Sequence, residues 1–324
     1  MTRFGLGVSN CHSALDVVAR VRRAEKLGAE IAFIAEDVNC RDAFELCALS
    51  AMQTTRIRLG TGVVNPFTRN PTALAMAIAT LDEISQGRAV LGLGTSSPSL
   101  IEDQMGIPTH KPVRAMRETT EIIRALLRGE SLTYPGERFV YAAARLQVHP
   151  VQARLPLYFG AMGPQMLRLA GRIADGVLLN VGASTDYIRW AVGEVHAGAV
   201  AAGRTPNEVT IAAWLSVYLT KDYEAGVQRA KEWLATMLSV PRQGELLLEH
   251  SNLDTSILGN IRSLVGGYPH TGDRLAAAAV VPRQVAERLT LIGTLEQVRE
   301  RIEEYRAAGV DVPVLGPSAL RALM

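Results

Sequence analysis

Short apolar runs alternate with longer amphipathic segments along most of this chain of 324 residues. The apolar residues of the longer segments recur every three to four positions, which is the period of a helix with one buried face. Short apolar runs between such helices are typical of parallel strands, because these are covered on both faces. Eight runs fit this description, at residues 4–8, 31–35, 57–61, 89–94, 157–160, 176–180, 209–219 and 312–315. The pattern therefore predicts an α/β fold with a parallel sheet.

Two architectures use this alternation, an open doubly wound sheet and a closed (β/α)8 barrel. The count of eight strands favours the barrel. No G-x-G-x-x-G motif follows the first strand, as it would in an open sheet that binds a dinucleotide. Barrels of about 250 residues or more fold as one unit. We therefore predict a single (β/α)8 TIM-barrel domain over residues 1–324.

Two segments interrupt the alternation without changing the order of the strands. Residues 132–148 contain aromatic and β-branched residues around a Pro-Gly turn, which predicts an inserted β-hairpin. Residues 240–288 contain several glycines and are predicted to form a mostly helical insertion near the barrel mouth. Signals for the start of a helix are Ser13, Asn70 followed by Pro71, and Thr294 with Gln297 in a capping box.

The charge balance argues against several classes of partner. The chain has 34 Lys and Arg against 32 Asp and Glu, with a net charge of +2 and no run of like charge. Nucleic-acid binders usually carry a basic excess and membrane spans need a long apolar segment, so neither partner is expected. The three cysteines, Cys11, Cys40 and Cys47, have neither metal-site spacing nor an even count. We expect a cytoplasmic protein with no disulfide framework and no metal ion.

Residues that follow the strands of a (β/α)8 barrel converge at one face, where the chemistry of this fold takes place. Glu36 and Asp37 follow the second predicted strand, close to Arg41. Adjacent carboxylates at this position are candidates for proton transfer. Asp42 is expected instead to cap the next helix, with Arg41 paired to an acid.

Three further strand-end loops suit a bound ligand. Gly62 begins a loop stiffened by two Asn-Pro steps, and a glycine there lets the backbone come close to a ligand. Gly94 and Thr95 begin a hydroxyl-rich segment that either binds a ligand or forms a turn. Residues 160–164 lead into a helix, whose N–H groups and positive end would hold a phosphate. The alternative for this last segment is an ordinary turn.

Taken together, these loops resemble those of the luciferase-like oxidoreductases. The most similar branch is the deazaflavin-dependent one, typified by the methylenetetrahydromethanopterin reductases. The resemblance covers nearly the whole chain and lies mainly in residues 35–42, 60–71, 160–166 and 170–177. It implies a homodimeric barrel that carries coenzyme F420 or flavin mononucleotide (FMN) at its carboxyl face.

The resemblance also implies where the coenzyme would lie. Gly62-Val63 would be a non-prolyl cis peptide, whose bulge presses the middle of the flavin ring, and the loop after the fifth strand would hold the phosphate. The coenzyme-binding residues implied in this way are Gly62, Val63, Val64, Asn65, Gly94, Thr95, Gly160, Ala161, Met162, Gly163 and Pro164.

Three acids are implied in catalysis by the same resemblance, namely Glu36, Asp37 and Glu102. Family members commonly have an acid followed by a histidine after the second strand, whereas here Asp37 follows Glu36. A histidine exchanges a proton near neutral pH, while an aspartate needs a raised pKa to act as an acid. The resemblance places Glu36 at the coenzyme ring and Asp37 towards the substrate. Glu102 would lie near a second acid position.

The expected function is hydride transfer between reduced F420 and a small organic acceptor, such as an imine, an enone or a ketone. One alternative is an FMN-dependent monooxygenase that takes reduced flavin from a partner reductase. A second alternative is a flavin-binding protein without turnover. Residues 98–111 and 240–288 are expected to shape the substrate site. The sequence has least pattern in these two segments, so it does not identify the substrate.

Overall fold

A closed barrel of eight parallel strands forms the centre of the molecule in the computed structural model, which describes residues 3–179, 182–266 and 270–324. The strands lie in the order β1-β12-β9-β8-β7-β4-β3-β2 around the barrel, and this order confirms the predicted fold. Their bounds are β1 Gly5–Val8, β2 Ile31–Ile34, β3 Arg58–Thr61, β4 Ala89–Leu93, β7 Leu157–Ala161, β8 Gly176–Leu179, β9 Thr210–Leu215 and β12 Val312–Leu315.

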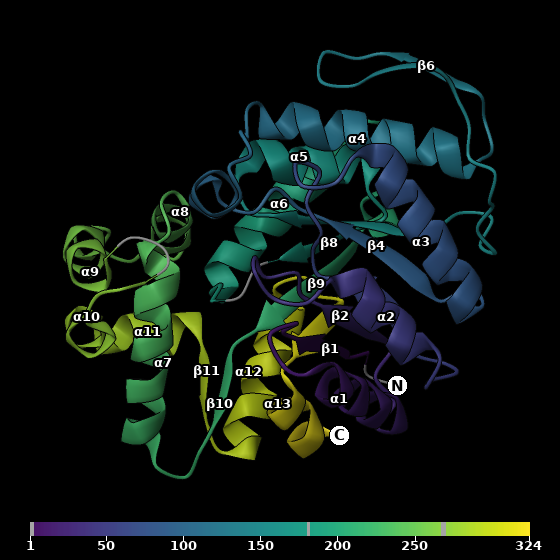
Figure 1. The fold of residues 1–324 in the computed structure, drawn as a ribbon. Coiled ribbons are helices and arrows are strands. Elements are labelled where there is room, and N and C mark those ends of the chain that lie inside the picture. The colour runs from purple at the N-terminus through teal and green to yellow at the C-terminus, as the bar shows by residue number, and fades with distance from the viewer. Residues whose placement is uncertain (1–2, 180–181, 267–269) are drawn as a thin grey trace.

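Helices surround the barrel on its outer side (Figure 1). The sequence signals mark their starts correctly: Ser13 accepts a hydrogen bond from Asp16, Asn70 accepts one from Thr72, and Thr294 forms the capping box. The helices that follow the barrel strands are α1 Ala14–Lys26, α2 Ala43–Ala51, α3 Pro71–Ser85, α4 Pro112–Leu127, α5 Pro164–Ile173, α6 Thr185–Ala201, α7 Tyr223–Ser239 and α13 Pro317–Leu323, and α12 Leu295–Ala307 precedes the last strand, β12. None of the helices in the described ranges has both the length and the apolar character needed to cross a membrane.

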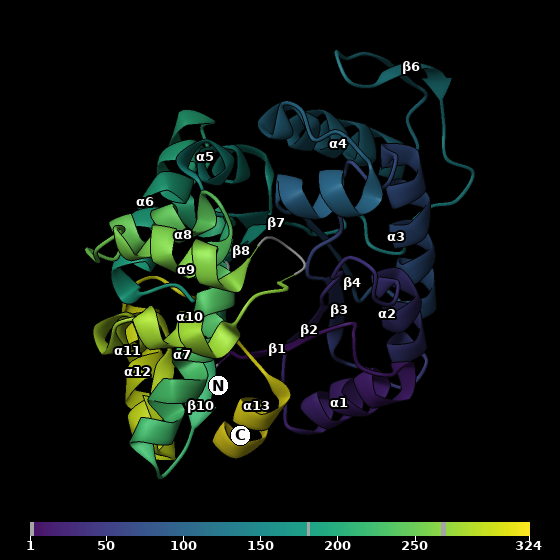
Figure 2. The same ribbon diagram turned by 60° about the vertical axis from the view of Figure 1, so that its left-hand side comes forward.

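Both predicted insertions are present. The hairpin consists of β5 Leu132–Pro135 and β6 Val140–Ala144, which pair antiparallel and project beyond α4 (Figure 1). The helical insertion consists of α8 Gln243–Glu249, α9 Ile257–Val265, α10 Arg274–Val280 and α11 Arg283–Leu289, which gather around α7 on one side of the barrel (Figure 2). The insertion therefore forms a separate wall beside the carboxyl ends of the strands.

The run at 209–219 was predicted as one strand, and this was wrong. It divides at Ser216 into β9, which belongs to the barrel, and β10 Val217–Leu219, which pairs in parallel with β11 Leu291–Gly293. The two barrel neighbours of β9 are β8, which ends opposite Ala213, and β12, which ends opposite Leu215. The chain beyond Leu215 therefore needs new partners for its backbone hydrogen bonds. The predicted sixth strand reached Asn180, which lies outside the described residues; β8 extends to Leu179.

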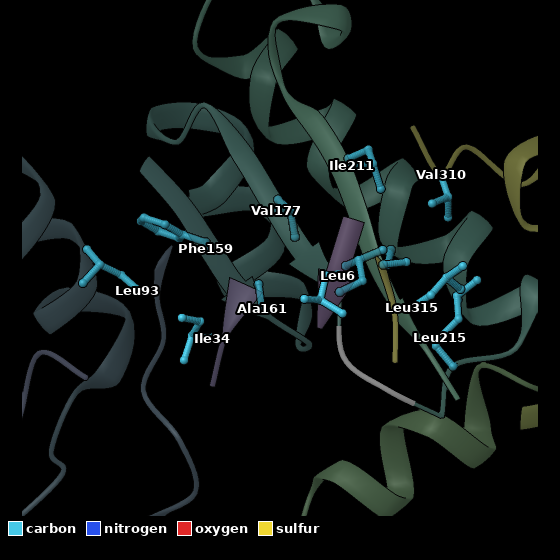
Figure 3. Packing of buried hydrophobic residues seen from close by; sticks show 14 of the residues in the cluster. Leu6, Ile34, Leu93, Phe159, Ala161, Val177, Ile211, Leu215, Val310 and Leu315 are labelled. Atoms are coloured by element: carbon cyan, nitrogen blue, oxygen red, sulfur yellow. The ribbon is translucent and has the colours of Figure 1, made fainter. Parts of the chain in front are cut away.

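The barrel strands are apolar on both faces because each face is buried by a different layer. In β2, Ile31 and Phe33 belong to the cluster inside the barrel, whereas Ala32 and Ile34 belong to the layer between the strands and the helices. Figure 3 shows part of that outer layer, with Ile34 and Phe159 among its members. This double burial explains why short, continuous apolar runs identified the strands.

Cys11 and Cys40 form a disulfide bond, which the sequence analysis did not predict. The two residues are separated by 29 positions in sequence, but they lie in the loops that follow β1 and β2. Since β1 and β2 are paired in parallel, the loops leave the same edge of the barrel side by side. Cys47 is buried and unbridged, and burial raises the pKa of its thiol. The expectation of a chain without disulfides was therefore wrong.

The disulfide can be tested by counting thiols. The protein denatured without reductant should show one reactive thiol, Cys47, and with reductant it should show three. Reduction should also lower the free energy of unfolding by about 3–4 kcal/mol, which is the chain-entropy value for a loop of this size. The C11S/C40S double variant should match the reduced wild type in urea, whereas C47S should keep its response to reductant. Three thiols in the unreduced protein would contradict the assignment.

Candidate active site

A cavity of about 1780 Å³ opens between the carboxyl ends of the barrel strands and the helical insertion. Residues that end or follow all eight strands line it, as the sequence analysis predicted for a barrel of this type. One lining residue from each of these strand ends, in chain order, is Ser9, Glu36, Gly62, Gly94, Ala161, Leu179, Ser216 and Gly316. Within the described ranges, no group of His, Cys, Asp or Glu side chains is arranged to hold a metal ion.

Glu36 is held by Arg69 at one edge of this cavity. Arg69 Nη2 lies 3.0 Å from Glu36 Oε1 and 2.6 Å from Asp42 Oδ2, so one guanidinium bridges the loops after β2 and β3. The backbone N–H of Ala43 also donates to Glu36 Oε2, at 3.2 Å. Burial raises the pKa of Glu36, and Arg69 opposes that rise only in part. Glu36 is thus a half-buried acid with a fixed orientation.

Asp42 caps α2 as predicted, by accepting hydrogen bonds from the backbone of Phe44 and Glu45. Burial acts to raise its pKa, but the hydrogen bond and charge of Arg69 lower the pKa below its ordinary value. Arg41 was expected to pair with an acid, but its guanidinium donates to the carbonyl oxygen of Cys11. The sequence predicted the capping role of Asp42 but not its ion pair with Arg69.

Asp37 lines the cavity in a different environment. Ser9 Oγ donates to Asp37 Oδ2 at 2.9 Å, and the backbone N–H of Asp37 donates to Asn10 Oδ1 at 3.0 Å. Asn10 is completely buried and also donates to the carbonyl oxygens of Asp37 and Arg41. Its amide therefore holds the loop after β2 against the loop after β1. The disulfide between those two loops adds a covalent link.

The Gly62-Val63 peptide bond is cis, as the resemblance implied. The side chain of Val63 lies against two glycines at neighbouring strand ends: a Cβ on Gly94 would overlap Val63 Cγ2, and one on Gly160 would lie 3.1 Å from it. Val64 is buried and fixes the bulge to β4, since its N–H donates to Gly92 at 2.9 Å. Val63 therefore lies at the cavity surface, while Val64 anchors it from behind.

Thr61 explains how β3 and β4 can separate at the bulge without leaving polar groups unpaired. Its hydroxyl donates to the carbonyl oxygen of Gly92 at 2.8 Å and accepts from the N–H of Gly92 at 3.0 Å. The side chain of Thr61 thus takes the place of a strand partner. Gly92 is needed for this approach, because a Cβ there would overlap the carbonyl oxygen of Thr61.

Asn65 follows the bulge and lines the cavity, although it is only 6% exposed. Its Oδ1 accepts a hydrogen bond from the N–H of Phe67 at 2.7 Å. Its Nδ2 is buried and donates to none of the described residues. Because an unpaired buried donor is costly, this amide is suited to a polar atom of a ligand in the cavity.

The loop between β7 and α5 forms the far side of the cavity floor. Gly160, Ala161, Met162 and Gly163 line the cavity, and Pro164 begins α5 just outside it. Gly163 is the N-terminal cap residue and offers no side chain to the first turn. The start of α5 is therefore positive and open to an anion.

Glu102 is separate from the other predicted acids. It lies in a short π-helical turn, Ser99–Asp103, where it is exposed and accepts hydrogen bonds from the hydroxyl and the N–H of Thr109. These hydrogen bonds, led by that of the hydroxyl, lower its pKa. Glu102 does not line the cavity, whereas Thr95 and Gly94 do. The structure therefore does not bring Glu102 together with Glu36 and Asp37.

Two cavity residues were missed by sequence reasoning. Arg69 lies between the two Asn-Pro steps of its loop, but its acidic partners come from the loop after β2, so the sequence did not indicate the pairing. Trp214, at the end of β9, lines the cavity but lies within an apolar run that suggested only a strand. The signals for both residues depend on which strand ends are neighbours in space.

The fold and this site define a luciferase-like oxidoreductase. A family model described as luciferase-like monooxygenase matches residues 2–312, and the chain belongs to this family. It is 33% identical to a 5,10-methylenetetrahydromethanopterin reductase of Methanolobus tindarius, over 97% of this chain and 93% of that protein.

Solved structures agree with this assignment. The coenzyme F420-dependent tetrahydromethanopterin reductase of Methanopyrus kandleri is 30% identical, with a TM-score of 0.88 over 99% of this chain and 96% of that chain. An F420-dependent secondary alcohol dehydrogenase shares the fold, with a TM-score of 0.79 at 20% identity, over 100% of this chain and 99% of that chain.

The opposite pKa shifts of Glu36 and Asp42 can be tested through stability. Folding raises the pKa of Glu36 above its ordinary value of 4.5, so the wild type loses stability as pH rises from 4.5 through the raised pKa. Gln does not titrate, so E36Q should gain stability relative to wild type across that window. Folding lowers the pKa of Asp42 below its ordinary value of 3.8, so the wild type gains stability as pH rises from the lowered pKa to 3.8. Asn does not titrate, so D42N should lose stability relative to wild type across that window.

Urea unfolding of wild type, E36Q and D42N at several pH values measures both differences. Each variant serves as the control for the other, because the two carboxylates share Arg69 but their pKa values shift in opposite directions. Differences from wild type that stay constant with pH would contradict both shifts.

Proposed function

We propose that this oxidoreductase binds coenzyme F420 over the Gly62-Val63 bulge and moves a hydride between it and an electrophilic carbon of a small organic acceptor. The acceptor would be an imine, an enone or a ketone. The observation that carries the proposal is Val63, which projects into the cavity between the glycine strand ends of β4 and β7. The names of the relatives at 33% and 30% identity support F420 as the coenzyme.

The residues present fit such a coenzyme. A side chain on Gly94 would overlap Val63 and one on Gly160 would crowd it, so the two glycines leave a backbone-lined floor for a flat ring system. Asn65 Nδ2 offers a buried donor that has no partner among the described residues. The open start of α5 at Gly163 suits the phosphate of the coenzyme.

When bound, the coenzyme would supply the hydride chemistry at its ring. Val63 and Asn65 would orient the ring, and the start of α5 would hold its phosphate. Glu36, fixed by Arg69, would contact the ring edge from the loop after β2. The surrounding walls would exclude water from the reacting carbon.

Asp37 is the acid best placed to exchange a proton with the substrate. It lines the cavity, and no Arg or Lys among the described residues forms an ion pair with it. Ser9 and Asn10 hold its side chain and backbone, which fixes the position of the carboxylate. This arrangement would replace the histidine that family members commonly have at this position.

Anaerobic titration of the wild-type protein with F420 and, separately, with FMN tests the choice of coenzyme. We expect F420 to bind at least about tenfold more tightly than FMN, a difference of about 1.4 kcal/mol in binding free energy. Tight binding of FMN without binding of F420 would favour the monooxygenase alternative. Binding of F420 without turnover of any imine, enone or ketone acceptor would favour a flavin-binding protein.

Asn in place of Asp37 tests the proton-exchange role. We expect D37N to lower kcat with reduced F420 by about 10²-fold or more, since it removes the acid, while the Kd for F420 stays within about twofold. The measurement is the oxidation of reduced F420 with a panel of imine, enone and ketone acceptors. E83Q, on the exposed face of α3, is the control. A wild-type kcat in D37N would remove Asp37 from the mechanism.

The homodimer implied by the resemblance stays a prediction, and so does the partner reductase of the monooxygenase alternative.

A further inference from the structure

Trp214 lies at the carboxyl end of β9, with its side chain inside the barrel. Ala212 and Trp214 face the interior cluster, whereas Ile211, Ala213 and Leu215 belong to the outer layer. The indole is partly exposed and lines the cavity. It therefore separates the apolar interior of the barrel from the space where a ligand would bind.

Gly7 in β1 makes room for this indole. A Cβ at position 7 would lie 2.7 Å from Trp214 Nε1 and would overlap the ring atoms Cε2 and Cζ2. The φ angle of Gly7 is not in the left-handed region, so the glycine is not required by its backbone conformation. What it provides is the close approach of the indole to the backbone of β1.

The opposite edge of the indole reaches the cis peptide. A Cβ on Gly62 would lie 3.6 Å from Trp214 Cζ3 and 3.5 Å from Leu178 Cδ2, which are ordinary contact distances. Val63 is packed against the same interior cluster as Trp214. The indole and the bulge therefore form one continuous apolar floor that runs from β1 to β3.

The indole N–H donates to no other described residue. Nε1 lies at the edge of the ring that packs against Gly7, where a Cβ would be only 2.7 Å away. The six-membered ring and its opposite edge extend from there towards the bulge.

We propose that Trp214 is a positioning residue for the tricyclic ring of the coenzyme. The indole extends the floor formed by Val63, and Gly7 is free of a side chain so that the indole can lie there. An aromatic platform restricts the tilt of a flat ring that lies on it. The inference rests on the proposed binding of F420 and adds a residue that acts on the orientation of the ring.

Affinity and turnover of four variants test the proposal. W214A should raise the Kd for F420 about tenfold and lower kcat at saturating F420, and W214F should recover most of both. G7A should resemble W214A, because the added methyl group displaces the indole. In the G7A/W214A double variant, G7A should add nothing further, since the space is then empty.

Fluorescence gives a readout that a purely structural role would not change. The chain has three tryptophans, Trp190, Trp214 and Trp233. Trp214 and Trp233 both line the cavity, so the comparison is made in a W233F background. There F420 should quench the emission of Trp214 on binding, and adding W214F should remove most of that quenching. W190F should keep it, because Trp190 stacks on His250 and does not line the cavity.

The outcomes separate this proposal from the proposed function. Unchanged affinity, kcat and quenching in W214A and W214F, with F420 bound by wild type, overturn the role of Trp214 and leave the proposed function standing. Additive effects of G7A and W214A overturn the role of Gly7 as the space for the indole. If wild type does not bind F420, both proposals fail. Circular dichroism identifies any variant that does not fold, and W214F and G7A then carry the test.

Discussion

The side-chain hydrogen bonds of Thr61 to Gly92 are the interaction on which the rest of the site depends. They hold β3 and β4 together where the ladder between the two strands ends, so the chain can leave the barrel as a bulge with its polar groups paired. Val63 then projects between Gly94 and Gly160, and Trp214 reaches the bulge from the opposite side. One hydroxyl and a few positions without side chains thus create an apolar floor at the mouth of the barrel.

The two neighbouring acids differ because their loops are held in different ways. Glu36 is half-buried and paired with Arg69, so its charge is compensated, but partial burial still raises its pKa. Asp37 is fixed by neutral donors and by the backbone, through Ser9 and Asn10. One acid is therefore paired with a guanidinium, whereas its neighbour in the same loop is held by a hydroxyl and a buried amide.

The sequence predicted the barrel well because its signals are local. Ser13, Asn70 and Thr294 cap helices through contacts within four residues, and the double burial of each strand is visible as an apolar run. The contacts between strand ends are not local. The disulfide of Cys11 with Cys40 and the fit of Trp214 over Gly7 require the closed order of the strands. Periodicity within one segment contains no information about them.

The cavity combines a barrel floor with a wall of different origin. Arg262 ties the wall together, since it donates to the carbonyl oxygen of Ser239 at 3.1 Å and lies 2.7 Å from Glu245. Trp233 of α7 joins this wall to the loop after β8, because a Cβ on Gly182 would lie 3.1 Å from the indole. None of these contacts involves the floor residues. The wall is thus held together by contacts of its own, apart from those that place Val63 and Trp214 in the floor.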